Sequence, residues 1–182
     1  SLEQTVAGAE LLFMGRLTMQ KDPLAFISLV AELKKYNPEI KAMMLGEGEL
    51  KDSCIHEIDR LNLQNNIELL GFKSNPFPYA AAAKLLVMTS RWEGFPLTAM
   101  EALSLGKPVL AYNTGGFKEV VKDGETGYLC NSFTEMFEKV NLLLENQDLL
   151  QEMGRQAQQW SAEKNNMENY ISSLKKIYGI NS

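Results

Sequence analysis

Residues 85–112 read LLVMTSRWEGFPLTAMEALSLGKPVLAY, and this stretch decides the fold. An apolar run over Leu85–Met88 leads into a polar loop, Thr89–Phe95, and then into a helical pattern over Pro96–Leu105. A second apolar run follows at Val109–Tyr112. Short apolar runs predict buried strands, and proline suits the first position of a helix. Two strands joined through a helix form a right-handed crossover, so this stretch predicts neighbouring parallel strands.

The same alternation continues toward both ends of the chain. Further strands are predicted at Glu10–Met14, Ile40–Leu45, Ile67–Leu70 and Tyr128–Cys130. Helices are predicted from Asp22-Pro23, over about Glu49–Leu61 and Pro78–Ala83, after Gly115-Gly116, and throughout the segment that follows Ser132. The apolar runs lack strict alternation, as is typical of strands covered on both faces. The sequence therefore predicts an α/β fold with a Rossmann-like, doubly wound parallel sheet.

Composition and charge narrow the classes of function. The chain has 182 residues, 45% of them hydrophobic, and a net charge of −5. Its basic residues are scattered, which argues against a nucleic-acid-binding surface. No apolar run reaches the roughly 20 residues of a transmembrane helix. Cys54 and Cys130 are expected to be reduced core thiols, and the single histidine, His56, is expected on the surface.

Functional residues are expected in the loops after the strands, because ligands of doubly wound sheets bind outside the carboxyl ends of the strands. Glu93 and Glu101 flank one such junction between a loop and a helix. Gly94 lets the backbone approach a ligand, and Pro96 favours a helix start. Free amides in a first turn attract an anion. Three amides are expected to be free here: those of Leu97, Thr98 and Ala99.

A second signal follows the first strand, where Gly15–Lys21 reads GRLTMQK. Arg16 can grip a phosphate through two parallel hydrogen bonds, and Lys21 supplies a compact positive charge. Two cations in a loop are weak evidence alone. Together with the helix start at Pro96 they predict a phosphate-binding crevice.

The ordered set of motifs resembles the carboxyl-terminal domain of glycosyltransferase family 4, whose members are retaining enzymes of the GT-B fold. After GRLTMQK, the resemblance rests on EGFPLTAME at Glu93–Glu101, GKPVLA from Gly106, TGGFKEVV from Thr114 and DGETGYL from Asp123. It implies that the chain is one half of a GT-B fold and binds a nucleotide-sugar donor. Pro96 departs from the family, in which many members have glycine, and Phe117-Lys118 stands where a proline often precedes the glutamate.

The resemblance also implies roles for individual residues. Arg16 and Lys21, beside Gly15, would hold the donor diphosphate. Glu93 would bind hydroxyls of the donor sugar and, with the two cations, belong to the catalytic set. Glu101 would bind the ribose. The remaining donor contacts would come from backbone around Gly94 and Phe95, from the amides of Leu97 and Thr98, and from Phe72 in the loop Gly71–Lys73. No metal or other cofactor is expected, because the family uses none for donor binding.

The resemblance further predicts what lies outside the donor site. GT-B enzymes have two Rossmann-like domains, so the natural protein is expected to be longer. The chain would then be an inactive half that meets a glycan or lipid-linked acceptor only through the other domain. Residues 1–8 are interpreted as a linker, 9–162 as the nucleotide-sugar-binding domain, and 163–182 as a helix that packs on that other domain. The expected setting is the cytoplasm, with a peripheral position at the inner membrane face as an option for the full-length protein.

Other functions stay open at this point. A glycoside hydrolase acting through Glu93 and Glu101 needs its two carboxyls about 5–9.5 Å apart across a bond, which a loop residue and a helix residue suit poorly. A non-catalytic nucleotide-sugar-binding module and an epimerase of the same fold are the remaining alternatives. Surface polysaccharide synthesis is the expected pathway class, and the sequence names neither base, sugar nor acceptor.

Overall fold

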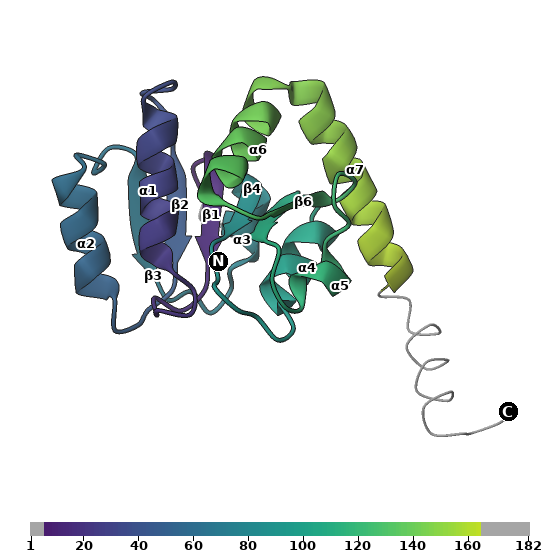
Figure 1. Ribbon diagram of the computed structural model, residues 1–182, viewed down its shortest axis with the longest axis horizontal. Coiled ribbons are helices and arrows are strands. Elements are labelled where there is room, and N and C mark those ends of the chain that lie inside the picture. The colour runs from purple at the N-terminus through teal and green to yellow at the C-terminus, as the bar shows by residue number, and fades with distance from the viewer. Residues whose placement is uncertain (1–5, 165–182) are drawn as a thin grey trace, which may run out of the picture.

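A six-stranded parallel sheet forms the centre of the fold, and its strands lie in the order β3-β2-β1-β4-β5-β6 (Figure 1). This computed structural model describes residues 6–164. The strands are β1 (Ala9–Met14), β2 (Ala42–Leu45), β3 (Ile67–Gly71), β4 (Ala83–Met88), β5 (Val109–Tyr112) and β6 (Gly127–Cys130). Every neighbouring pair of these strands is parallel. The predicted doubly wound α/β fold is therefore confirmed.

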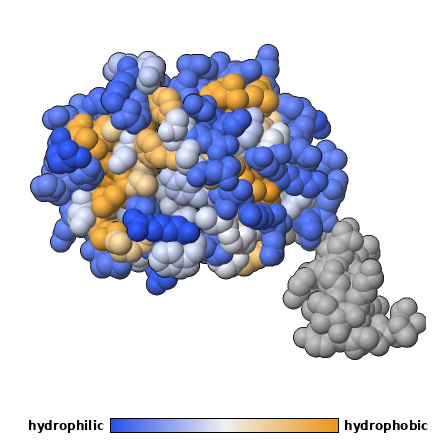
Figure 2. Space-filling view, viewed as in Figure 1, coloured by the Kyte–Doolittle hydropathy of each residue, from blue (hydrophilic) through white to orange (hydrophobic). Residues whose placement is uncertain are grey.

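Helices cover both faces of the sheet. They are α1 (Pro23–Lys34), α2 (Lys51–Arg60), α3 (Phe77–Ala82), α4 (Leu97–Ser104), α5 (Phe117–Val120), α6 (Phe133–Glu145) and α7 (Gln147–Lys164). Buried residues of α1, α2 and α6 pack on one face, and those of α3, α4 and α5 pack on the other, while α7 contributes to both cores. On the surface seen in Figure 2, hydrophobic residues form small patches among hydrophilic ones. This pattern is expected of helices that bury one side only.

The strands explain why two cores form. Leu11 and Phe13 of β1 belong to one buried cluster, whereas Leu12 and Met14 belong to the other. Successive side chains of a strand point to opposite faces, so a strand with apolar residues at both parities is stable only between two helix layers. The sheet is therefore buried on both sides, and only its ends and edges are left for a ligand.

One end of the sheet carries a crevice because of the chain's route. From β1 the chain moves outward to β2 and β3, and it then returns to β4 beside β1 before moving the other way. The loops after β1 and β4 therefore diverge at the carboxyl ends of two adjacent strands. Such a switch point is where open α/β sheets bind ligands.

Local signals in the sequence set several element boundaries. Helix α1 begins at Pro23, and the Asp22 side chain accepts a hydrogen bond of 3.3 Å from the amide of Ala25, as its N-cap role predicts. The helical pattern predicted after Ser132 is confirmed as far as residue 164, and Asn146 divides it into α6 and α7. The Asn146 side chain accepts a hydrogen bond from the Leu149 amide, which starts the next helix. The predicted terminal helix lies outside the described residues from position 165 onward.

Candidate functional site

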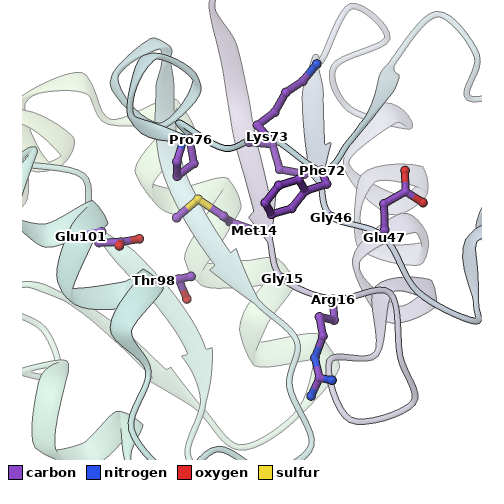
Figure 3. A pocket seen from close by; sticks show the side chains of 11 residues that line it. Met14, Gly15, Arg16, Gly46, Glu47, Phe72, Lys73, Pro76, Thr98 and Glu101 are labelled. Carbon is purple, nitrogen blue, oxygen red and sulfur yellow. The ribbon is translucent and has the colours of Figure 1, made fainter.

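A cavity of about 480 Å³ opens at the carboxyl end of the sheet, beside the switch point. Figure 3 shows that α4 supplies one wall of the cavity and that the segments after β1, β2 and β3 supply the other. Its lining residues are Met14, Gly15, Arg16, Leu45, Gly46, Glu47, Phe72, Lys73, Pro76, Thr98 and Glu101. Five of the residues predicted from the sequence to bind a donor are among them: Gly15, Arg16, Phe72, Thr98 and Glu101.

The α4 wall presents a carboxylate and a free amide. Glu101 and Thr98 lie one turn apart on the face of the helix that borders the cavity. The expectation of three free amides at the helix start is wrong for two of them. The Leu97 amide donates to the carbonyl of Phe95, and the Ala99 amide donates to that of Pro96. Within the described residues, only the Thr98 amide of this group has no acceptor, so the anion site at this helix start has one backbone donor rather than three.

The opposite wall presents an aromatic ring and a cation. The Phe72 side chain borders the cavity although its residue is 74% exposed. Arg16 is exposed, and its guanidinium makes no ion pair or hydrogen bond with any residue that the structure describes. Figure 3 shows the Lys73 side chain extending away from the Phe72 ring. This wall therefore offers a flat apolar surface and an uncommitted positive charge.

Lys21 and Glu93 lie beside the cavity and form an ion pair with each other. The Lys21 stem passes next to Gly15, since a Cβ placed on that glycine would lie 3.5 Å from Cδ of Lys21. The side chains of Lys21 and Glu93 are only 16% and 11% exposed. The two residues were predicted to serve different parts of a donor, and the structure brings them into direct contact.

Two glycines of the TGG motif support the loop that carries Glu93. A Cβ on Gly116 would lie 1.7 Å from the carbonyl oxygen of Gly94, and a Cβ on Gly115 would lie 2.1 Å from that of Glu93. The Gly116 amide also donates to the Glu93 carbonyl over 3.0 Å. Only residues without a side chain allow so close a backbone approach. The motif therefore serves the fold by holding the loop in place.

Gly94 differs from these glycines. A Cβ at this position would meet nothing within 4 Å, and its φ angle lies outside the left-handed region. The amides of Gly94 and Phe95 donate to no acceptor among the described residues. The loop's rim is also apolar, because Phe95 and Leu97 are 53% and 65% exposed. Nothing in the fold requires a glycine at position 94, whereas close approach of a ligand would.

The structure adds residues that the sequence did not single out. Met14, Glu47 and Pro76 line the cavity, and they carry no motif that marks them. Arg91 forms an ion pair with Asp22 over 2.8 Å. Asp22-Pro23 predicts a helix start from neighbouring residues alone. The pairing of Asp22 with Arg91 cannot be predicted in this way, because the two residues lie 69 positions apart and no periodicity or spacing links them.

Other groups that could carry chemistry are set apart from the cavity. Cys54 and Cys130 are buried and unpaired, and burial raises the pKa of the first thiol to about 11 and of the second to about 12. They are therefore protonated, structural thiols, as predicted. His56 is exposed on α2. No cluster of three or more metal-ligating side chains occurs in residues 6–164. None of the helices described in that range combines the length and apolar character needed to span a bilayer.

Comparison with known proteins supplies independent findings. The family model described as Glycosyl transferases group 1 matches residues 6–160. The chain is 32% identical to the poly(glycerol-phosphate) alpha-glucosyltransferase of Bacillus subtilis, over 88% of this chain and 24% of that protein. Its sequence similarity to this relative therefore extends over nearly all of the described fold.

Two solved structures resemble the fold closely. A mutant of S. aureus TarM, in complex with Fondaparinux, alpha-GlcNAc-glycerol and UDP, has a TM-score of 0.87 and 26% identity, covering 96% of this chain and 36% of that one. The C-terminal domain of a glycosyl transferase group 1 family protein, LpcC of Francisella tularensis, has a TM-score of 0.77 and 25% identity, covering 87% of both chains. The chain thus spans about a quarter to a third of the length of the B. subtilis and S. aureus proteins.

Proposed function

The chain belongs to the glycosyl transferases group 1 family, and we propose that it is the donor-binding domain of a retaining glycosyltransferase of family 4. Its Rossmann-like sheet matches glycosyltransferase structures of the GT-B type. The proposed reaction moves a sugar from a nucleotide sugar to an acceptor hydroxyl. Two observations favour a single donor-binding domain: the TarM match covers 36% of that chain, and the LpcC match is itself described as a C-terminal domain.

One observation carries the proposal: a single cavity at the switch point joins a carboxylate, an exposed aromatic ring, and a guanidinium and a helix amide that have no partner within residues 6–164. These are the groups of Arg16, Thr98, Glu101 and Phe72. A nucleoside diphosphate needs the same four chemical features: two for its phosphates, one for the ribose hydroxyls and one for the base face. The relative TarM was crystallised with UDP, which agrees with this ligand class.

The groups proposed to bind the diphosphate would also assist transfer of the sugar. Breaking the bond between sugar and phosphate leaves negative charge on the departing diphosphate. Arg16 would hold it through two parallel hydrogen bonds, and Lys21 and the Thr98 amide would add charge and a donor. Electrostatic stabilisation of the leaving group lowers the barrier without any protonation step. No metal is part of this proposal, because Arg16 and Lys21 would supply the positive charge beside the phosphates.

The sugar end would lie at the loop Glu93–Phe95. A carboxylate accepts hydrogen bonds from two neighbouring hydroxyls, and the Gly94 and Phe95 amides donate to no acceptor in the part of the chain that the structure describes. Glu93 would meet the sugar only after the bound phosphates compete for Lys21, its present partner. Glu101 would take the ribose, and the loop Gly71–Lys73 would border the base.

The acceptor is proposed to reach the donor through a second domain of a longer protein. We assign residues 9–162 to donor binding, 1–8 to a linker and 163–182 to a contact with that domain. The glycan or lipid-linked acceptor and a role in surface polysaccharide synthesis follow relatives such as the B. subtilis poly(glycerol-phosphate) alpha-glucosyltransferase. A cytoplasmic setting agrees with two unpaired, buried cysteines.

The test is a thermal-shift screen with uridine, guanosine and adenosine diphosphates and their sugars. One nucleoside diphosphate should raise the melting temperature by mass action, with a dissociation constant between tens of micromolar and millimolar, or about −4 to −6 kcal/mol. The isolated chain should transfer no sugar, whereas a full-length protein should, with retained configuration at the sugar carbon by NMR. Failure of every nucleotide to shift the melting temperature contradicts donor binding. Equal turnover by the isolated chain contradicts the two-domain proposal.

A further inference from the structure

The loop that follows β1 is tied to the loop that follows β4 by a set of contacts that no sequence motif marks. The Arg91 amide donates to the Gln20 carbonyl over 2.8 Å, and the Gln20 side chain donates to the Trp92 carbonyl over 3.1 Å. The buried Thr89 hydroxyl lies 3.0 Å from the Lys21 carbonyl and 2.8 Å from the Asp22 carbonyl, so it can donate to either. These bonds cross the switch point at the residues that flank Lys21.

Asp22 occupies the centre of this set in an unusual backbone conformation. Its φ and ψ angles are 47° and 59°, in the left-handed region that residues with a side chain seldom adopt. One carboxylate oxygen caps α1 by accepting from the Ala25 amide, and the other accepts from Nε of Arg91 over 2.8 Å. The chain direction at Lys21 depends on this conformation because Lys21 is the preceding residue.

We propose that Asp22 and Arg91 are positioning residues, which hold Lys21 against Glu93 and thereby in reach of the donor diphosphate. The contact of Lys21 with a diphosphate rests on the proposed function, whereas the contact of Lys21 with Glu93 does not. Asp22 follows Lys21 directly, and Arg91 stands two residues before Glu93. The Asp22–Arg91 ion pair therefore fixes the backbone next to both residues of the Lys21–Glu93 ion pair. The Asp22 carboxylate is occupied by the Ala25 amide and by Arg91, so these two residues bind each other and the helix start rather than offering free groups to the donor.

The geometry accounts for why two ion pairs occur side by side. Lys21 has a long, flexible stem, and a lysine free in its loop would lose much rotamer entropy on meeting a phosphate. Held beside Glu93 by the Asp22–Arg91 bridge, it is already ordered before the ligand arrives. Arg91 itself is 51% exposed at its side chain, so its contribution to overall stability is expected to be small.

The first test needs no nucleotide. The acetylation rate of Lys21 by acetic anhydride, measured by mass spectrometry, should rise several-fold in R91A, because the amine leaves its partner. R91K, which keeps the charge, should restore most of the protection. Lys139, on α6, reports general changes in reactivity, and R155A removes an arginine from an exposed ion pair on α7 as the matched control. Unchanged Lys21 acetylation in R91A overturns the proposal.

The second test uses UDP and a double-mutant cycle. R91A should weaken UDP binding about 5- to 20-fold while shifting the melting temperature no more than R155A does. The double variant K21A/R91A should bind no more weakly than K21A alone, because Arg91 acts through Lys21. Additive losses would mean that Arg91 acts on its own, which contradicts a positioning role. If Lys21 acetylation rises in R91A but K21A binds UDP as the parent does, the positioning stands and the phosphate role of the proposed function falls.

Discussion

The two ends of the sheet offer cavities of similar size but of different chemistry. The crevice at the carboxyl ends measures about 480 Å³, and a second cavity of about 450 Å³ lies where β4 and β5 begin, against α7. Both carry basic side chains, because the second is lined by Lys84, Lys107 and Arg155. A count of positive charges would therefore not tell the ends apart.

The two cavities differ in whether their basic groups already have hydrogen-bond or ion-pair partners. At the amino ends, Lys84 pairs with Glu10 over 3.2 Å, Lys107 donates to the Ala81 carbonyl over 2.6 Å, and Arg155 pairs with Glu152 over 2.6 Å. At the carboxyl ends, Arg16 and the Thr98 amide have no partner among the described residues. A donor without an acceptor is what a bound anion would satisfy, so the exposed Arg16 guanidinium favours the carboxyl ends as the place of the proposed ligand.

The largest effect should come from removing two cations at one end or at the other. R16A/K21A should weaken nucleoside diphosphate binding by about 3 kcal/mol or more, over a hundredfold, because each lost charge-assisted bond is worth about 1.5–3 kcal/mol. K84A/R155A removes the same net charge at the other end and should leave the calorimetric dissociation constant within about twofold. A loss of the same size in both variants would show that overall charge, and not the crevice, attracts the nucleotide.

Close glycine contacts occur at both ends of the sheet. Gly116 meets Gly94 at the carboxyl ends, and Gly154 meets Gly106 at the amino ends, where a Cβ on Gly154 would lie 2.5 Å from the Gly106 carbonyl oxygen. Both G116A and G154A should lower stability by about 2–3 kcal/mol, with a drop in melting temperature of about 5–10 °C. Only G116A should also weaken binding of the nucleotide sugar, because it displaces the loop of Gly94, which is proposed to contact the sugar.

G94A should spare stability, unlike G116A, and serves as its matched control. Its new methyl group meets open space, so stability should stay within about 0.5 kcal/mol of the parent, while binding of the nucleotide sugar falls several-fold. Calorimetric titration and a melting curve on the same samples separate the two quantities. A destabilised G94A with normal binding would reverse the roles given to the two glycines.

Local sequence signals predicted the fold well because the alternation of apolar strands and amphipathic helices repeats along the chain. The βαβ unit of residues 85–112 and the Asp22-Pro23 helix start depend on neighbours in sequence, and both appear where expected. The helical segment after Ser132 is divided at Asn146, within the polar run Glu145–Asp148. The left-handed conformation of Asp22 was missed, since Thr89 and Arg91 stabilise it from a distant loop.

Smaller effects should distinguish the two carboxylates of the crevice. E101A should weaken binding of the bare nucleoside diphosphate about 10-fold, because Glu101 lines the cavity and would lose its bonds to the ribose. E93A should affect mainly the nucleotide sugar, measured as the ratio of the two dissociation constants. Equal losses of bare nucleotide in both variants would remove the division between ribose and sugar.

The candidate site was only partly accessible from the sequence. The motifs identified some residues on each wall, because their loops follow predicted parallel strands whose carboxyl ends lie at the same edge of the sheet. The sequence could not show that Lys21 and Glu93 pair with each other, or that the Leu97 and Ala99 amides are used by Phe95 and Pro96. These depend on side-chain and turn geometry that motif spacing does not encode.

The smallest effect is expected from chelators. EDTA should leave the UDP dissociation constant unchanged, since residues 6–164 hold no cluster of three metal-ligating side chains and the crevice supplies its own cations. Calorimetry with and without added magnesium or manganese measures this. A strict requirement for either metal would mean that Arg16 and Lys21 do not suffice for the diphosphate.

The most direct test of the central claim is to map where UDP binds by amide chemical shifts in the ¹⁵N-labelled chain. The largest shifts with UDP should fall on the amides of Arg16 and Thr98, which have no acceptor among the described residues, and those of Gly94 and Phe95 should follow with the nucleotide sugar. Residues such as Lys84 and Gly106, at the opposite cavity, should move little. Shifts that cluster around that opposite cavity, or the absence of any shift at millimolar UDP, would contradict the assignment of the crevice as the donor site.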